Sequence, residues 1–460
     1  MAVGMAAALA WHGWQGWGLQ KTYPYNTFLF NPASSYTDYL NARNSALLPV
    51  PYASGLPDGY FPASYALFYR VFAIYNPMDG FLLFLNISLL TMLVVSIYVL
   101  HPIAREQIAA LRTRAAQAGK RLPKMTFARI YAASLVYALA VLCLSYPVWF
   151  VINRANNEIF ITLFIGLSLV FISQCRYGMG MAWLLPGICL KLYPAVLLVL
   201  FLRRKKLFWI GVAVAAFVLA NWASLATFSP AINESLDLER KAMALMYDQG
   251  IIGNWGMAGS ATAWNGCKLL IEWLNYQGDA GTLPTDAYRA GLIPLLRDYL
   301  VVFNMCSLLG AAIVSLYAGF IEREFLRRVV ALLLFLVMAS PYGADYKLLH
   351  VVTALMAMLL IRTRRPCDWV IVALLAFVLV PKKEILIPFA GTTDSGFADV
   401  SVAIILNPLC MLLAAVLLAW DGLRQWKWRW SKKRFLILLS SFGIRWGGRP
   451  PAKVPVDSTA

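Results

Sequence analysis

Long apolar runs alternate with short polar or basic blocks along most of the chain, a pattern typical of membrane-spanning helices. The stretches at 80–100 and 400–420 are long enough to cross a hydrocarbon core about 30 Å thick. The same pattern predicts further helices at about 1–18, 130–151, 159–174, 208–226, 299–320, 329–341, 346–361 and 367–380. The sequence therefore predicts an all-α polytopic membrane protein with about ten spanning helices.

The run between Arg176 and Arg203 interrupts this alternation. Both arginines are expected on the cytoplasmic side, but the 26 residues between them are too few for two full crossings, which need about 40. Pro186 and Pro194 interrupt the run, and Lys191 lies near its middle. We therefore predict two short helices that meet at Lys191 partway across the membrane. Because broken backbone at that depth is tolerated where it is buried or lines a polar cavity, Lys191 is a candidate site residue.

Two long polar segments, 21–79 and 228–298, separate the apolar runs and are predicted to lie outside the cytoplasm. Within the first, the aromatic and amphipathic stretch 60–76 is expected to lie along the membrane surface. We predict one integral-membrane domain over 1–420. The basic, aromatic segment 421–460 is predicted to be a cytoplasmic amphipathic tail.

Composition supports the membrane interpretation, because 60% of the residues are hydrophobic and only 13% are charged, against about 25% charged in soluble domains. The net charge of +18 comes from blocks between apolar runs. By the positive-inside rule these blocks are cytoplasmic, so they indicate topology and contact with anionic lipid, and no nucleic-acid partner. The predicted location is the cell inner (plasma) membrane, with several crossings.

The carboxylates follow the opposite pattern, since few of the 22 fall in segments predicted cytoplasmic. Those few are Glu106, Glu322, Glu324, Asp368, Asp421 and Asp457. In contrast, the outside ends of helices and the predicted break carry Asp38, Glu158, Lys191, Asp345 and Lys347. The sequence thus predicts a site at the lipid–water boundary that faces the periplasm or exterior.

The seven cysteines indicate neither a disulfide framework nor a zinc site. Only Cys267 falls in a predicted outside loop, and no cysteine–histidine spacing resembles a zinc motif. The first outside segment has no Asp-x-Asp pair. We therefore expect no tightly held metal and no cofactor.

An outside carboxylate together with a lysine at a helix break suits transfer of a sugar from a lipid phosphate to a hydroxyl. Asp38 would act as the general base, typically worth about 10²–10⁴ in rate. Lys191 would stabilise the negative charge that develops on the phosphate. Tyr36, Tyr39 and Asn41 surround Asp38 in sequence and are expected to hold the carboxylate or the sugar.

Each of these candidates also has a purely structural interpretation. Asp38 can be a solvated or helix-capping carboxylate, and Lys191 can extend its ammonium to the membrane interface. The other structural interpretations are a Glu158–Arg154 pair, an Asp345–Lys347 pair, packing of His350 and loop capping by Asn254.

Four stretches, in order over about residues 25–365, resemble the motifs of one enzyme family. They are TDYLNARN followed by LPVPY and YFPASY, then NNEIF, then LLPGICLKLYP followed by RRKK, and finally SPYGADYK. Their layout resembles the GT-C glycosyltransferase fold, and the motifs resemble glycosyltransferase family 87. That family contains polyprenyl-phosphate-sugar-dependent mannosyltransferases and arabinofuranosyltransferases.

The resemblance implies roles for individual residues. The family's catalytic acid corresponds to Asp38, and its lysine at a helix break corresponds to Lys191. Its late Ser-Pro cluster corresponds to 340–347, where Lys347 would supply the positive charge that a histidine often gives. Together with the residues around Asp38, the predicted substrate-binding positions are Tyr36, Tyr39, Asn41, Glu158, Tyr193, Asn254, Asp345 and Tyr346. The chain departs from the family at Asn157–Glu158, where the family often has Gly-Gln.

The implied activity is that of an inverting glycosyltransferase on the outer face of the membrane. It would transfer one sugar, mannose or another hexose or pentose, from a polyprenyl-phosphate carrier to a hydroxyl of a lipid or glycan acceptor. A secondary transporter or lipid-carrier flippase is the alternative class, and an O-antigen-ligase-like enzyme that uses diphosphate carriers is a third. One clear helix break without a matching half, together with two long outside loops, favours an enzyme over a transporter.

Overall fold

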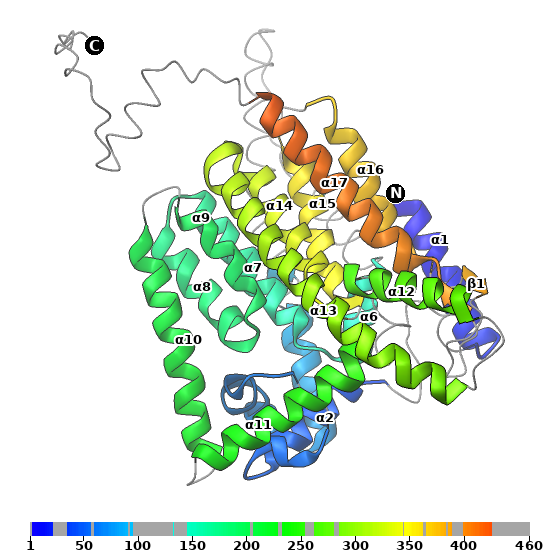
Figure 1. Cartoon of the computed structure of the whole chain (residues 1–460). Helices are drawn as coiled ribbons and strands as arrows, with labels where there is room; N and C mark the ends of the chain where they lie inside the picture. Colours follow the sequence, from blue (N-terminus) through cyan, green and yellow to red (C-terminus); the bar gives the residue numbers. More distant parts are fainter. Residues whose placement is uncertain are drawn as a thin grey trace, which may run out of the picture.

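The structure is a computed structural model, and its described residues are 2–21, 35–56, 59–90, 93–94, 132, 145–202, 206–228, 232–253, 262–279, 285–343, 345–361, 365–382, 385–388 and 399–425. Nearly all regular structure within them is helical (Figure 1), as the apolar pattern predicts. The one sheet described is a pair of three-residue antiparallel strands, β1 (Leu386–Pro388) and β2 (Asp399–Ser401). The predicted site residue Asn254 and the tail from residue 426 lie outside the described residues.

Short 3-10 or π-helical turns, labelled η, connect or extend several of the helices. The elements before residue 203 are α1 (Ala2–Gly13), η1 (Trp14–Gly18), α2 (Thr37–Leu47), η3 (Pro51–Ser54), η4 (Ser64–Tyr69), α3 (Arg70–Ala73), α6 (Tyr146–Arg154), α7 (Glu158–Ser173), α8 (Tyr177–Leu190), η5 (Tyr193–Leu198) and α9 (Val199–Leu202). The later elements are α10 (Leu207–Phe228), α11 (Ile232–Met246), η6 (Tyr247–Ile252), α12 (Ala263–Asp279), α13 (Thr285–Leu316), η8 (Tyr317–Ile321), α14 (Phe325–Met338), η9 (Asp345–Leu348), α15 (Leu349–Leu360), α16 (Asp368–Val378) and α17 (Ala403–Gln425).

Fewer helices than predicted are long enough to cross a membrane. In the described part of the chain, Leu207–Phe228, Gly291–Ile321 and Ala403–Gln425 are long and apolar enough. A fourth span arises if Ser64–Ala73 and Pro77–Leu90, which meet at a bend of 115°, form one broken span. The prediction of about ten spans is not confirmed. Apolar helices such as α7 and α16 are shorter than the roughly 20 residues that a crossing needs, and much of the predicted helices 80–100 and 130–151 lies outside the described residues.

The predicted break at Lys191 is confirmed. Helix α8 ends at Leu190, and Lys191 has extended backbone angles of φ −148° and ψ 132°. The chain then turns through η5, which begins at Tyr193 with Pro194 in its first turn. Because proline has no backbone N–H and fixes its own φ, it is tolerated at the start of this new turn.

The second predicted outside loop, 228–298, is more helical than expected. It contains α11, η6 and α12, and α13 begins at Thr285 instead of about 299. The amphipathic character of α11 and α12 explains the difference, since each has an apolar side that packs on its neighbours. The stretch 60–76 is helical from Ser64, as its amphipathic pattern suggested, although its position relative to a membrane stays a prediction.

Two hydrophobic clusters form the interior. The larger one joins α7, α8, α14, α15, α16 and α17, which lie side by side in Figure 1. The smaller one joins α2, α3, α6 and residues around Phe81 and Phe84. The start of α7 and the start of α15 belong to both, since Ile159 and Leu349 lie in the smaller cluster and Ile161 and Val351 in the larger one. Polar side chains on these two helix ends are therefore enclosed from both sides.

Candidate functional site

The turn between α6 and α7 presents the central polar residues of the site. Helix α6 ends with Ala155 in the left-handed region, at φ 49°, where the N–H groups of Ala155 and Asn156 donate to the carbonyls of Ile152 and Val151. This is the hydrogen-bond pattern of a helix-ending Schellman turn, in which glycine is usual. Opposite it, Tyr36 at φ 62° donates its N–H to the Asn153 carbonyl at 2.7 Å. Two non-glycine left-handed residues thus flank one site, which is typical of functional sites that other contacts hold in place.

Asp38 lies in the first turn of α2 and faces the turn after α6. Its Oδ1 accepts a hydrogen bond from the Arg154 guanidinium, and its Oδ2 accepts one from Asn156 Nδ2 at 2.8 Å. The carboxylate side chain is 17% exposed, so it is neither solvated on the surface nor fully enclosed. A carboxylate offers about four lone-pair positions. Asp38 is therefore fixed by two donors and still has acceptor capacity toward a third group.

Glu158 is the first residue of α7, and it is completely buried. Its carboxylate accepts from Lys191 Nζ at 2.8 Å, lies 2.9 Å from His350 Nε2 and accepts from the Tyr193 hydroxyl. These partners come from the helix break and from α15, far apart in sequence. A buried carboxylate is stable only when charged and polar groups satisfy it in this way. Glu158 therefore acts as the anchor that holds the other side chains of the site together.

Lys191 lies between two aromatic rings as well as beside Glu158. Its Nζ is 5.5 Å from the centre of the Tyr60 ring and 5.4 Å from that of the Tyr346 ring. These distances are those of cation–π contacts. Its Nζ also lies 3.4 Å from Asn156 Oδ1. Lys191 is thus held by contacts within the protein, which favours the site over the interpretation that its ammonium extends to the membrane interface.

Lys347 brings a second ammonium to the same region. Its Nζ donates to Ser340 Oγ at 2.5 Å and to the Tyr342 carbonyl at 2.6 Å, and it lies 5.3 Å from the centre of the Tyr193 ring. Burial lowers the pKa of Lys347 from 10.5 to about 8, while the negative charge of Glu158 opposes that shift and Lys191 adds to it. Burial therefore makes Lys347 easier to deprotonate than an ordinary lysine, because its pKa is lowered.

The structure brings together many of the residues that the sequence singled out. Asp38, Glu158, Lys191, Tyr193, Tyr346 and Lys347 form one connected group with Asn156 and His350. Hereafter these eight residues are called the polar cluster. Asp345 is buried beside it in η9.

Three predicted substrate-binding residues are unsuited to direct contact with a substrate or pack against other residues. Tyr39 is fully buried against Phe72, Phe81 and Phe84, so its assignment to substrate binding is wrong. It faces the hydrophobic side of α2, the side opposite to the one that exposes Asn41. Tyr36 is 38% exposed and packs its ring on Phe81 at 4.1 Å between centroids. Glu158 is in the site but has no exposed surface, so it positions other groups and does not touch a substrate directly.

Sequence reasoning missed four residues of the site. Arg154 was considered only as a structural partner of Glu158, and Asn156 only as part of the NNEIF stretch. His350 was interpreted as a packed residue, yet it contacts Glu158. Tyr60 faces Lys191. The three-residue spacing of Lys347 and His350, one helical turn, is the signal that would have linked those two.

Comparison of the chain with protein-family models, with curated proteins and with solved structures found no match. Any function must therefore be argued from the polar cluster and its surroundings.

Proposed function

We propose that this protein is an integral-membrane inverting glycosyltransferase of GT-C type. It transfers one sugar, mannose or another hexose or pentose, from a polyprenyl-phosphate carrier to a hydroxyl of a lipid or glycan acceptor. The observation that carries the proposal is the convergence of a fixed, partly exposed carboxylate, Asp38, with two ammonium groups, Lys191 and Lys347, within one network. The helices of the same chain that are long and apolar enough to cross a membrane support a lipid-borne substrate.

The chemistry needs a base and a cation on opposite sides of the reacting carbon. Asp38 takes the proton of the acceptor hydroxyl while that oxygen forms a bond to the anomeric carbon. The bond from that carbon to the carrier phosphate breaks, and the phosphate leaves with the electron pair. A single displacement inverts the configuration. Hydrogen bonds from Arg154 and Asn156 fix the orientation of the Asp38 carboxylate, so that its remaining lone pairs can accept the proton of the acceptor hydroxyl.

The lysines suit the leaving phosphate. Lys191 has 15% of its side chain exposed, and it is positioned by Glu158 and by the two tyrosine rings. An ammonium held in place before the reaction stabilises developing negative charge without the cost of reorientation. Tyr60 and Tyr346 add ring faces of the kind that sugars pack against. The proposed orientation puts this site at the periplasmic or exterior surface of the inner membrane, as the positive-inside rule suggests.

The two helix breaks bear on the transporter alternative. One break lies at Lys191 and the other at residues 74–76, where the bent pair of helices meets. Both fall in the first half of the chain. Transporters that use broken helices usually have them in corresponding positions of two halves. The arrangement in the described residues therefore favours the enzyme.

Sugar transfer by the purified protein in lipid nanodiscs tests the proposal. Radiolabelled polyprenyl-phosphate sugars are supplied one at a time with a membrane-lipid extract as acceptor. We expect one of them to be consumed, and Asp38→Asn to lower turnover by about 10²–10⁴ with donor binding retained, because only basicity is removed. Asp237→Asn, an exposed carboxylate on α11, is the matched control and should transfer normally.

Consumption of none of the donors would refute the enzyme assignment. Near wild-type turnover of Asp38→Asn would instead refute the role of Asp38 and leave the activity standing. Donor binding is followed separately, so loss of folding is recognised by loss of both readouts.

A further inference from the structure

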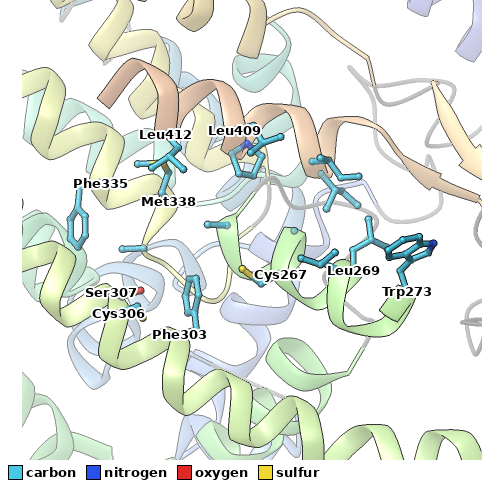
Figure 2. A pocket seen from close by; sticks show the side chains of 17 residues that line it. Cys267, Leu269, Trp273, Phe303, Cys306, Ser307, Phe335, Met338, Leu409 and Leu412 are labelled. Atoms are coloured by element: carbon cyan, nitrogen blue, oxygen red, sulfur yellow. The ribbon is translucent and has the colours of Figure 1, made fainter. Parts of the chain in front are cut away.

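A large apolar cavity lies apart from the polar cluster, between α12, α13, α14 and α17 (Figure 2). Its volume is about 750 Å³, within the range of about 300–1,000 Å³ that is usual for pockets that bury a small organic molecule. Side chains from all four helices point into it, among them Trp273, Phe303, Met338 and Leu412. None of the described residues that line it is charged.

The chemistry of the lining selects an apolar occupant. Apart from the indole nitrogen of Trp273, the polar or sulfur-bearing side chains among the described residues of its wall are Cys267, Cys306, Ser307 and Met338. Several lining residues, among them Trp273 and Leu412, are about half exposed, so the cavity is open on one side. An open site with so apolar a lining favours an apolar molecule. An occupant with many charged or hydrogen-bonding groups would lose its hydration here without compensation.

The two long walls of the cavity belong to helices that qualify as membrane spans. Helix α13 exposes Leu308, Leu309 and Ile313 on the sides that do not face the cavity, and α17 exposes Leu413 and Val416. Few residues of the α13 span are buried within the protein. Because lipid surrounds such helices, a molecule can reach the cavity from the hydrocarbon region without crossing water.

One wall of the cavity leads directly to the polar cluster. Met338 and Ala339 line the cavity at the end of α14, and the next residue is Ser340. The Ser340 hydroxyl accepts from Lys347 Nζ at 2.5 Å. Consecutive Cα atoms are about 3.8 Å apart. The apolar wall therefore ends one residue from a contact of the ammonium that is proposed to bind phosphate.

We infer that this cavity binds the hydrocarbon chain of the polyprenyl-phosphate donor, whose phosphate lies at Lys347 and Lys191. This inference rests on the proposed function, because it assigns the tail of the same lipid whose head group reacts. A free phosphate or a short-chain phosphate would meet the lysines but leave the cavity empty. An ordinary phospholipid has the chains but a different head group.

Binding of a sugar-free, long-chain polyprenyl monophosphate to the full chain in nanodiscs tests the inference without any sugar transfer. Leu412→Trp places a larger side chain on the wall of the cavity, whereas Leu413, its neighbour on α17, is exposed to a similar extent but is not part of that wall, so that Leu413→Trp is the matched control. We expect Leu412→Trp to weaken binding of the long-chain phosphate at least tenfold. Leu413→Trp should bind like wild type, and a single-isoprene phosphate should bind all three proteins equally.

Thiol labelling gives a second readout in the wild-type chain. An apolar maleimide should modify Cys306 in the cavity wall, and mass spectrometry of the peptides follows its rate. Cys306 and Cys175, between α7 and α8, are both exposed, but only Cys306 lines the cavity. The long-chain polyprenyl phosphate should therefore slow labelling of Cys306 at least tenfold and leave that of Cys175 unchanged. Phosphatidylglycerol and the single-isoprene phosphate should not protect Cys306.

Equal protection by phosphatidylglycerol would overturn the assignment to the carrier lipid, and no protection by the polyprenyl phosphate would overturn the cavity as its site. Unchanged affinity of Leu412→Trp for the long-chain phosphate would likewise overturn the cavity as its site. Failure of the proposed sugar transfer can be distinguished from failure of the proposed lipid site. Protection without any sugar transfer refutes the proposed activity alone, and transfer without protection refutes the cavity alone.

Discussion

The pair of Glu158 and Lys191 gives the sharpest test of how the site is held together. The variants are Glu158→Gln, Lys191→Met and the double variant. Glu158 is fully buried, and its carboxylate lies 2.8 Å from Lys191 Nζ. Removal of one partner of a buried ion pair costs about 3–5 kcal/mol, because the other charge stays behind without compensation. We expect the loss of stability in Glu158→Gln to lie at the lower end of this range, since Lys191 keeps 15% of its side chain exposed and water can reach it.

The double variant should lose much less than the sum of the two single variants. It removes both charges, so no uncompensated ion remains, and the coupling free energy should be about 1.5–3 kcal/mol. Thermal unfolding in detergent micelles measures this. With an unfolding entropy of about 2 cal/mol/K per residue, the whole chain gives roughly 1 kcal/mol per degree. Each single variant should therefore lower Tm by about 3–5 °C.

The exposed pair of Asp237 and Arg240 on α11 is the matched control. Its N–O distance is 3.5 Å, and both side chains are more than half exposed. Such pairs contribute little, so Asp237→Asn and Arg240→Met should shift Tm slightly and additively. If the losses of Glu158→Gln and Lys191→Met also add to within about 0.5 kcal/mol, the two residues act separately, and the argument that Glu158 positions Lys191 fails.

Three further predictions concern charge, the central amide and topology. Because the folded-state pKa of Lys347 is about 8, binding of a polyprenyl phosphate should weaken between pH 7 and 9 as the ammonium loses its proton. The contribution of Lys347 to the free energy of unfolding should rise over pH 8–10.5, where the unfolded chain binds more protons. Lys347→Arg should remove both effects, since a guanidinium stays charged, and affinity titrations and melts across pH measure them. Asn156→Asp should reduce sugar transfer at least tenfold, because the new carboxylate would repel the carboxylate of Asp38. Asn156→Gln should retain part of the activity, and equal losses in the two variants would contradict this explanation. Reporter fusions at residues 115 and 365 should read cytoplasmic and those at 55 and 265 exterior, and a cytoplasmic result at 55 would overturn the orientation.

The sequence was sufficient to predict features that depend on local pattern. Apolar runs located most of the helices, and the short distance between two basic blocks located the break at Lys191. Both predictions depend on the number of residues in a segment, which can be counted directly from the sequence. The number of spans is not confirmed in the described residues, because pattern alone does not distinguish a helix that crosses lipid from a shorter one buried among other helices.

The partners within the site were harder to predict, because they depend on contacts between distant segments. Arg154 pairs with Asp38, more than a hundred positions away, and Glu158 pairs with Lys191 and His350. From sequence alone, Arg154 is the nearest cation to Glu158, which made that pair the natural structural interpretation. The fold instead places the carboxylate at the helix start inward and the arginine at the helix end outward. Tyr39 was misassigned for a similar reason, since neighbours in sequence on a helix face different sides.

Asn156 explains how a base and a cation can share so small a site. Its Nδ2 donates to Asp38 Oδ2 at 2.8 Å, and its Oδ1 accepts from the Glu158 N–H at 3.0 Å and lies 3.4 Å from Lys191 Nζ. An amide is the side chain that offers a donor on one side and an acceptor on the other without a net charge. It therefore links the carboxylate to the ammonium while it keeps them from pairing directly. A direct ion pair would occupy Asp38 and Lys191 with each other, whereas the amide between them leaves each oriented toward a substrate.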